Sequence, residues 1–235
     1  MIKSGIDQDA MIAMFSQATA KQGEALRKAV GEATLKALQG RELTLANIRS
    51  VVKTMTEAAS TGAARSGLPV PDVEAMLGEA FAGMDAALLK AVEAQRRALE
   101  QIVSQGVDVQ DKQIKAALAN LEKMEDNFFA AVAKAAQGAG APLQGPWDKV
   151  LETMKLQGTS SGMLANQSVE QMLAQTKTAL RDGRAASLKA AQALMQGYST
   201  LVSGVLIGMS EGLQPRAGAA AAPAAKAAPR RKPAA

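Results

Sequence analysis

The sequence has no cysteine and no histidine among its 235 residues. The first absence excludes disulfides, thiolate metal ligands and a cysteine nucleophile, and the second removes the imidazole that most often serves as a catalytic base or metal ligand. The chain also lacks an Asp-x-Asp-x-Asp-Gly loop of the kind that binds calcium. We therefore expect a protein that is not an enzyme, with no catalytic, metal-binding or cofactor-binding residues.

Aromatic residues are scarce at 3%, although hydrophobic residues make up 48% of the chain. The apolar residues are mainly Ala, Leu, Val and Met, which recur at intervals of three and four positions, and no useful span alternates between apolar and polar residues. Ala, Leu, Met, Gln, Glu, Lys and Arg lose little on entering a helix. The sequence therefore predicts an all-α protein, a bundle or rod of long amphipathic helices that pack as in a coiled coil.

Glycine and proline mark the expected helix ends. We expect helices over 7–38, from Thr44 to about 61, over 72–105, from Asp108 through Val132, over 148–156 and over 163–211. The segment 138–146 (GAGAPLQGP) holds three glycines and two prolines and predicts a hinge, with Trp147 as an anchor against a neighbouring helix. The predicted organisation is an N-terminal helical region 1–137, the hinge 138–146, a C-terminal helical region 147–212 and a disordered tail 213–235.

Long hydrophobic runs are missing as well. The most apolar stretch, 201–209, is far shorter than the roughly 20 residues that cross a bilayer. Asp7 and Asp9 interrupt the N-terminus before an apolar run of signal-peptide length. We expect no transmembrane segment, no secretion and a cytoplasmic location.

Two glycine patterns stand out. Residues 158–162 (GTSSG) match the nucleophile motif G-x-S-x-G, but without a histidine base we interpret them as a flexible Ser/Gly linker. Gly204, Gly208 and Gly212 recur every four residues, a spacing that lets another helix backbone come close. They predict either close helix packing within the bundle or a self-association face, and we expect a homo-oligomer.

The twelve methionines also allow two interpretations. Their flexible side chains fill irregular gaps between helices in a packed core. They also suit adsorption to a fluid apolar surface on which helices lie flat.

The last 21 residues, from Pro215 to Ala235, carry five bases and no acid. Removing these five from the 27 bases of the chain leaves 22, which equals the number of acids, so the body is formally neutral. Such a composition predicts a disordered arm that either only solubilises the protein or tethers it to an anionic surface or to DNA without sequence specificity. The tethering residues would be Arg216, Lys226, Arg230, Arg231 and Lys232.

The Ala-rich helices with Met and Leu faces, the absence of cysteine and the tail from Pro223 to Pro233 resemble the phasins, bacterial proteins that coat polyhydroxyalkanoate granules. Several phasins are similar in using a basic Ala/Lys/Pro arm to contact the nucleoid. The resemblance implies a granule-coating or scaffolding protein that adsorbs to a storage inclusion through apolar helix faces. The alternatives are a nucleoid-associated protein that binds nucleic acid through its tail, and an adaptor bundle that recognises a protein partner.

Overall fold

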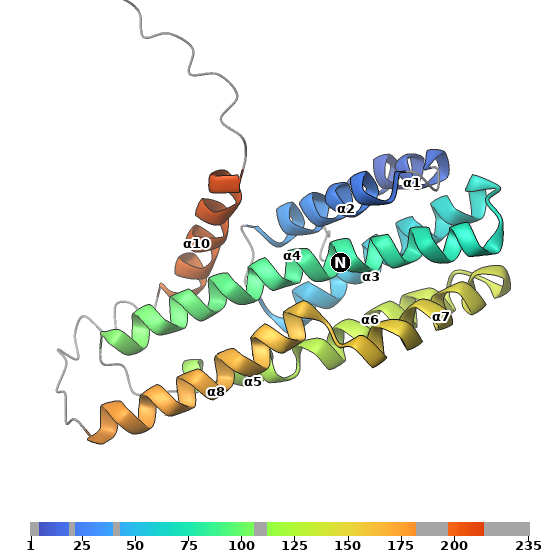
Figure 1. The fold of residues 1–235 in the computed structure, drawn as a ribbon. Helices are drawn as coiled ribbons and strands as arrows, with labels where there is room; N and C mark the ends of the chain where they lie inside the picture. Colours follow the sequence, from blue (N-terminus) through green and yellow to red (C-terminus); the bar gives the residue numbers. More distant parts are fainter. Residues whose placement is uncertain (1–4, 19–21, 40–42, 106–111, 182–196, 214–235) are drawn as a thin grey trace, which may run out of the picture.

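The structure, a computed structural model, describes residues 5–18, 22–39, 43–105, 112–181 and 197–213, and this part of the chain is all-α, without β-strands. The helices, whose numbering follows Figure 1, are α1 (Gln8–Gln17), α2 (Gly23–Leu38), α3 (Leu45–Ser66), α4 (Val70–Ser104), α5 (Lys112–Glu122), α6 (Met124–Gln137), α7 (Ala141–Gln157), α8 (Ser160–Arg181) and α10 (Tyr198–Leu213). The predicted fold class, a bundle of long helices, is confirmed. The predicted tail 213–235 lies, apart from Leu213, outside the described residues.

Several helix ends follow from local sequence. The side chain of Thr44 accepts a hydrogen bond from the Asn47 amide at 3.2 Å, which caps the start of α3 as predicted. Asp7 caps α1 in the same way, through a 3.1 Å bond from the Ala10 amide. Gly67 ends α3 with a φ of 66°, a left-handed conformation that glycine adopts without steric cost. The chain then turns directly into α4.

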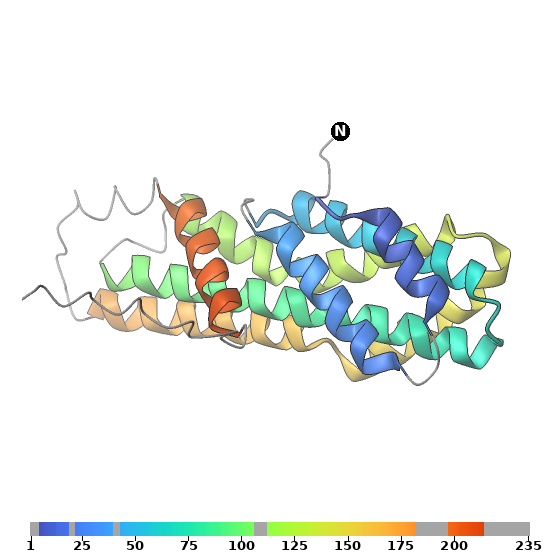
Figure 2. The ribbon, with the colours of Figure 1, turned by 90° about the horizontal axis from the view of Figure 1, so that it is seen from above.

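The helices stack in three layers (Figure 1). Helices α1 and α2 cover one side of the α3–α4 pair, where α1 packs on α3 and α2 on α4. The other side is covered by α5 to α8, with α6 against α3 and both α7 and α8 against α4. Figure 2, seen from above, shows α2 and α10 crossing over different parts of the long helix α4. Helix α4 is therefore the central element of the bundle.

The predicted helix 7–38 is wrong as a single element, because two helices, α1 and α2, occupy this range. Ala18 has an extended conformation and ends α1. One straight helix of this length would extend about 48 Å and could not place both halves over the same helix pair. The contacts of α1 with α3 and of α2 with α4 therefore require a reversal of the chain.

The predicted helix through Val132 likewise consists of two helices, α5 and α6, that meet at Lys123. The Lys123 amide donates to Ala119 and its carbonyl oxygen accepts from Asn127, so the chain bends without leaving helical hydrogen bonding. The bend lets α5 pack on α8 while α6 packs on α3 and α7. In the predicted helix 163–211, α8 and α10 are described, and 182–196 lie outside the described residues.

The predicted hinge is shorter than expected. Only residues 138–140 lie between α6 and α7, and residues 141–146 form the first turns of α7. Pro142 fits there because the first helical residues need no intrahelical amide donor. Trp147 is the expected anchor, since it is fully buried and its Nε1 donates to the Ser60 hydroxyl at 2.9 Å. Core residues on both sides of this segment belong to one hydrophobic cluster.

That cluster runs through the whole described bundle, from Met11 in α1 to Leu206 in α10. Within it, the rings of Phe81 in α4 and Phe128 in α6 lie 4.6 Å apart. Six methionines are buried in the core, as the gap-filling interpretation predicts: Met11, Met55, Met76, Met84, Met124 and Met172.

Two glycines allow close helix crossings. A Cβ atom at Gly62 of α3 would collide with Phe15 and with the backbone oxygen of Ile12 in α1. A Cβ atom at Gly83 of α4 would lie 2.5 Å from the carbonyl oxygen of Arg27 in α2. Both positions need glycine because the neighbouring helix backbone occupies the space that a side chain would fill.

Candidate functional site

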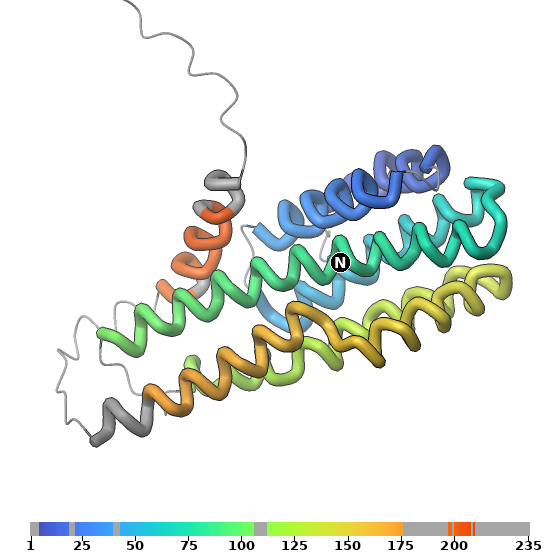
Figure 3. The backbone as a smooth tube through the Cα atoms, viewed as in Figure 1, coloured from blue at the N-terminus to red at the C-terminus, as the bar shows by residue number. Residues whose placement is uncertain are grey.

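The most apolar helix of the described chain is α10, which has 16 residues and a single charged one, Glu211. Figure 3 shows its described part leaning across the C-terminal half of α4, at the edge of the bundle. Its main packing partner is α4. Val202 and Leu206 are buried in this contact, whereas Val205 is only partly buried. Helix α10 therefore packs on the bundle through one of its faces only.

A polar group lies inside the contact between α10 and α4. The Tyr198 hydroxyl is buried beside the side chain of Gln95 without a hydrogen bond of good geometry. Burial raises the pKa of this hydroxyl, and the Gln95 side chain lowers it by a smaller amount. The Gln95 amide itself donates to the Ala117 carbonyl of α5 at 3.4 Å. A buried phenol with poor hydrogen bonding costs free energy, so this contact is held less firmly than a purely apolar one.

The predicted packing glycines lie in α10, and the structure places Gly204 on its outer side. Gly204 is exposed, and a Cβ atom there would meet no atom within 4 Å. Close packing within the bundle is therefore wrong for this residue, because the helix turns its larger side chains toward α4. Gly208 and Gly212 belong to the same helix. Self-association through this stripe stays a prediction.

The predicted tethering residues are not part of the described structure. They lie in the segment 214–235, outside the described residues: Arg216, Lys226, Arg230, Arg231 and Lys232. Helix α10 ends at Leu213, two residues before the basic segment begins.

The Gly-Thr-Ser-Ser-Gly motif begins α8, so the prediction of a flexible linker is wrong. One oxygen of Glu125 accepts bonds from the Thr159 amide at 2.9 Å and from its hydroxyl at 2.7 Å. The two oxygens of Asp85 accept from the amides of Ser160 and Ser161 at 3.0 and 3.1 Å. Carboxylates from α6 and α4 thus satisfy the free amides at the positive end of α8.

This arrangement explains the second glycine of the motif. A Cβ atom at Gly162 would collide with the Glu125 carboxylate. Both carboxylates accept hydrogen bonds from backbone amides. Its role is to fasten α8 to α4 and α6.

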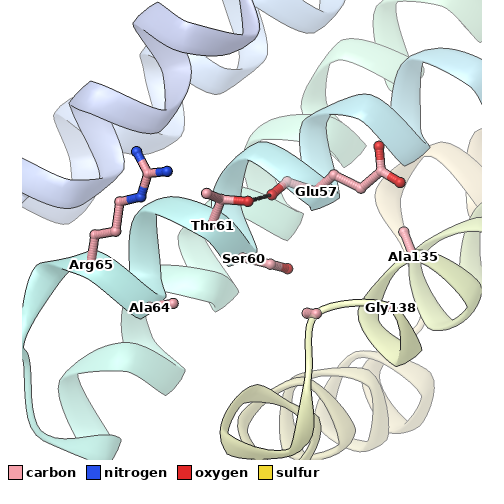
Figure 4. Close-up of a pocket in the computed structure, with 8 residues that line it drawn as sticks. Glu57, Ser60, Thr61, Ala64, Arg65, Ala135 and Gly138 are labelled. Atoms are coloured by element: carbon pink, nitrogen blue, oxygen red, sulfur yellow. Dashed lines mark hydrogen bonds between the residues drawn. The ribbon is translucent and has the colours of Figure 1, made fainter.

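A small cleft lies between α3 and the turn from α6 to α7. It has a volume of about 280 Å³ and its walls include Glu57, Ser60, Arg65 and Gly138. Figure 4 shows Ser60 and Gly138 on opposite sides of the cleft and the guanidinium of Arg65 directed away from Gly138. The Ser60 hydroxyl donates to the Thr56 carbonyl at 2.7 Å while accepting from Trp147, so it is fully engaged. The serine of the cleft is therefore held by the packing of α3 against Trp147.

Large apolar side chains are exposed at few places in the described chain. They are spread over α4, α7, α8 and α10: Val70, Leu156, Met163, Leu173 and Ile207. Acidic side chains do not gather in groups of three that could hold a metal ion within the part of the chain that the structure describes.

None of the helices described here is both long and apolar enough to cross a membrane.

Comparison with known proteins places the chain in a family without assigning an activity. The model of a family of unknown function (DUF6781) matches residues 1–215, which include every described helix. No curated protein and no solved structure matches the chain. Because the matched region covers more than half of the sequence, the chain belongs to this family of unknown function, DUF6781.

Proposed function

We propose that the protein is a non-enzymatic coating or scaffolding protein of the cytoplasm that adsorbs through apolar helix faces to a polyhydroxyalkanoate storage inclusion or a similar apolar surface. The observation that carries this proposal is the continuous apolar cluster to which every described helix contributes. Only seven polar residues are buried among the described ones. Apolar attraction is non-directional, so faces that pack on one another can equally pack on another apolar surface.

The residues in the helix contacts favour the replacement of helix–helix packing by packing on an external apolar surface. Of the 16 buried residues of α4, six are Ala or Gly, including Ala87, Ala91 and Ala94. An alanine methyl removes far less apolar area from water than a leucine side chain, at about 0.8 kcal/mol per buried CH₂ group. The helices therefore adhere weakly for their length. A surface that accepts several faces at once competes effectively with the bundle.

The closed bundle presents little apolar surface of its own. Leu156 and Met163 are the most exposed large apolar residues of the described chain, at 83% and 63%, and they are flanked by polar neighbours such as Lys155 and Gln157. Single exposed apolar residues are ordinary on protein surfaces. Adsorption therefore depends on a helix face that is covered in solution.

The test is partition of the full-length chain between buffer and an emulsion of polyhydroxyalkanoate. We expect most of the protein on the droplets, with its helical circular dichroism retained. The same result should hold in high salt and when the five tail bases are replaced by Gln, because the attraction is apolar. Protein that stays wholly in solution would contradict the proposal.

A second candidate function rests on the distribution of charge. The five tail bases equal the net charge of +5, so the remainder of the chain is formally neutral. A tether to nucleic acid through the tail would make the protein nucleoid-associated. In that case DNA binding should fall steeply with salt and disappear when the tail bases are replaced by Gln, whereas salt-independent binding would contradict it.

We also propose a homo-oligomer that forms through the outer side of α10. Its support is the open space around Gly204, which admits a second helix. Gly204→Leu should leave the protomer folded, because nothing in it lies within 4 Å, and should shift the protein toward monomer in sedimentation velocity. An unchanged sedimentation coefficient would remove this face from the interface.

A further inference from the structure

Helix α10 combines an apolar composition with a shallow contact to the bundle. Its buried or partly buried apolar residues form one stripe: Leu201, Val202, Val205, Leu206 and Met209. The opposite side carries the exposed residues Thr200, Gly204 and Ile207. The larger apolar face is thus the one that α4 covers. That face becomes available when α10 leaves α4.

The contact that covers this face is suited to reversible opening. Its main partner is a single helix, and it encloses the Tyr198 hydroxyl without a hydrogen bond of good geometry. By contrast, α8 is fastened by carboxylates from two other helices, Asp85 and Glu125. Undocking α10 leaves those fastenings and the core between α1 and α8 in place.

The segment that follows α10 determines which surface this helix meets. Residues 215–235 carry five bases and no acid, directly after a helix whose one charged residue is Glu211. An apolar face alone would adsorb to any apolar surface, and a basic segment alone would bind any polyanion. An apolar helix followed directly by a basic segment fits a surface that presents hydrocarbon and negative charge side by side. A lipid layer with anionic headgroups is such a surface.

The length of α10 specifies how it would lie. Sixteen residues extend about 24 Å, which is shorter than the hydrocarbon core of a bilayer at about 30 Å. A helix of this length with one apolar face lies in the plane of the headgroups, with that face toward the acyl chains. The basic segment then remains at the headgroup level, where its charges are attracted to anionic lipid.

We propose that α10 undocks from α4 and, together with the basic segment, anchors the protein on an anionic lipid surface. This inference rests on the proposed function, because it assigns the covered apolar face on which adsorption depends, and it adds anionic lipid as a surface that this face meets together with the basic segment. The remainder of the bundle stays folded and faces the aqueous side.

The absence of cysteine makes the test direct, because a single introduced thiol takes an environment-sensitive fluorophore. Val205→Cys places the label on the covered face of α10, and Leu156→Cys places it at the 83% exposed position in α7 as a control. Each full-length variant is mixed with vesicles of phosphatidylcholine, with or without phosphatidylglycerol. We expect a blue shift at position 205 with the anionic vesicles only, and no shift at position 156.

Matched substitutions identify the parts that bind. Leu201→Glu puts a carboxylate on the inserted face at a partly exposed position, and Leu156→Glu makes the same change elsewhere. The first should weaken vesicle binding by at least about tenfold, and the second should leave it within about twofold. Replacing all five bases by Gln should also weaken binding by at least about tenfold. Equal effects of the two Glu variants, or equal binding to neutral vesicles, would overturn the inference.

The outcomes separate this inference from the function on which it rests. If neither label responds to anionic vesicles while the chain still coats polymer droplets, the anchor is wrong and the coating function stands. If position 205 responds to vesicles but the chain ignores polymer droplets, the anchor stands and the polymer inclusion is wrong. A response to DNA without a change at position 205 would show that the basic segment binds anions alone, which also overturns the anchor.

Discussion

Gly83→Ala should separate α2 from α4 and destabilise the bundle, although alanine is the better helix former. Gly83 is buried at the crossing of the two helices. A Cβ atom there would lie 2.5 Å from the carbonyl oxygen of Arg27 and 2.9 Å from the Cβ of Val30. The oxygen belongs to the backbone of α2, which has no rotamer by which to move away. The helix must therefore shift as a unit.

The size of the effect follows from this geometry. An ordinary contact begins at 3.4 Å, so α2 has to move by roughly 0.9 Å at this crossing. A gap of 0.5–1 Å removes about a quarter to a half of the dispersion attraction of the atoms that face it, and overpacking typically costs about 1–3 kcal/mol. The helix propensity of alanine returns about 1 kcal/mol. We expect a net loss of about 1 kcal/mol, or about 2–4 °C in Tm.

Gly78→Ala supplies a matched control in the same helix. No atom lies within 4 Å of a Cβ at this position, so the substitution should stabilise the protein by about 1 kcal/mol. The measurement is equilibrium unfolding in urea, followed by circular dichroism and by the fluorescence of Trp147, the only tryptophan. Equal effects of the two substitutions, in sign and size, would refute the close approach of α2 and α4.

Three further perturbations test individual contacts. Glu125→Ala removes the acceptor at the start of α8 and should lower the free energy of unfolding, measured in urea, by about 1–3 kcal/mol. The control Glu122→Ala, at an exposed position, should change it by less than about 0.5 kcal/mol. Equal losses would contradict the role of Glu125 in fastening α8. Ser60→Ala leaves the buried Trp147 Nε1 without an acceptor and should cost about 1–3 kcal/mol, and a double variant with Trp147→Phe should lose less than the sum of the two. Burial raises the pKa of the Tyr198 hydroxyl above its usual value of about 10. The docked state of α10 therefore keeps its full stability below pH 10 and loses stability as the pH rises further. Absorbance titration of this single tyrosine measures the shift, and a midpoint near pH 10 would contradict it.

The fold class was predictable because the helical period of the sequence matches the buried face of the structure. In α4, the predicted positions Val73, Met76, Leu77, Ala80 and Phe81 are all buried. The cap at the start of α3 was also readable, since threonine caps through its own side chain. These features depend on contacts within one helix, which a sequence displays directly.

The chain reversal between α1 and α2 and the bend at Lys123 were not predictable in the same way. No proline lies near either break, and apolar residues recur across the second one at Leu121 and Met124. The breaks exist because each half packs on a different helix. Such tertiary requirements leave little trace in local sequence.

In the candidate site, too, some features were readable from the local sequence and others depended on tertiary packing. The apolar stretch of α10 and the basic segment were visible in the sequence, but the direction in which Gly204 points was not. A stripe of glycines every four residues looks alike whether it faces the bundle or the solvent. The acids that fasten α8 could not be identified from the sequence either. Asp85 and Glu125 lie 75 and 34 residues from the backbone amides whose hydrogen bonds they accept. For Gly83, an isolated glycine in a strongly helical segment was the available signal.

Small residues decide both how the bundle closes and which of its helices can leave. At Gly62 and Gly83 they let two backbones meet, and a larger side chain would force the helices apart. Along α4 the many Ala and Gly residues make each helix contact shallow, so additional hydrogen bonds contribute substantially to holding a helix in place. Helix α8 has such bonds from two carboxylates, whereas α10 has an apolar stripe and a poorly bonded phenol. Because the free energy of undocking is the sum of these local terms, α10 should exchange its backbone amide hydrogens faster than α8. Hydrogen exchange that protects both helices equally would place the adsorbing face elsewhere in the bundle.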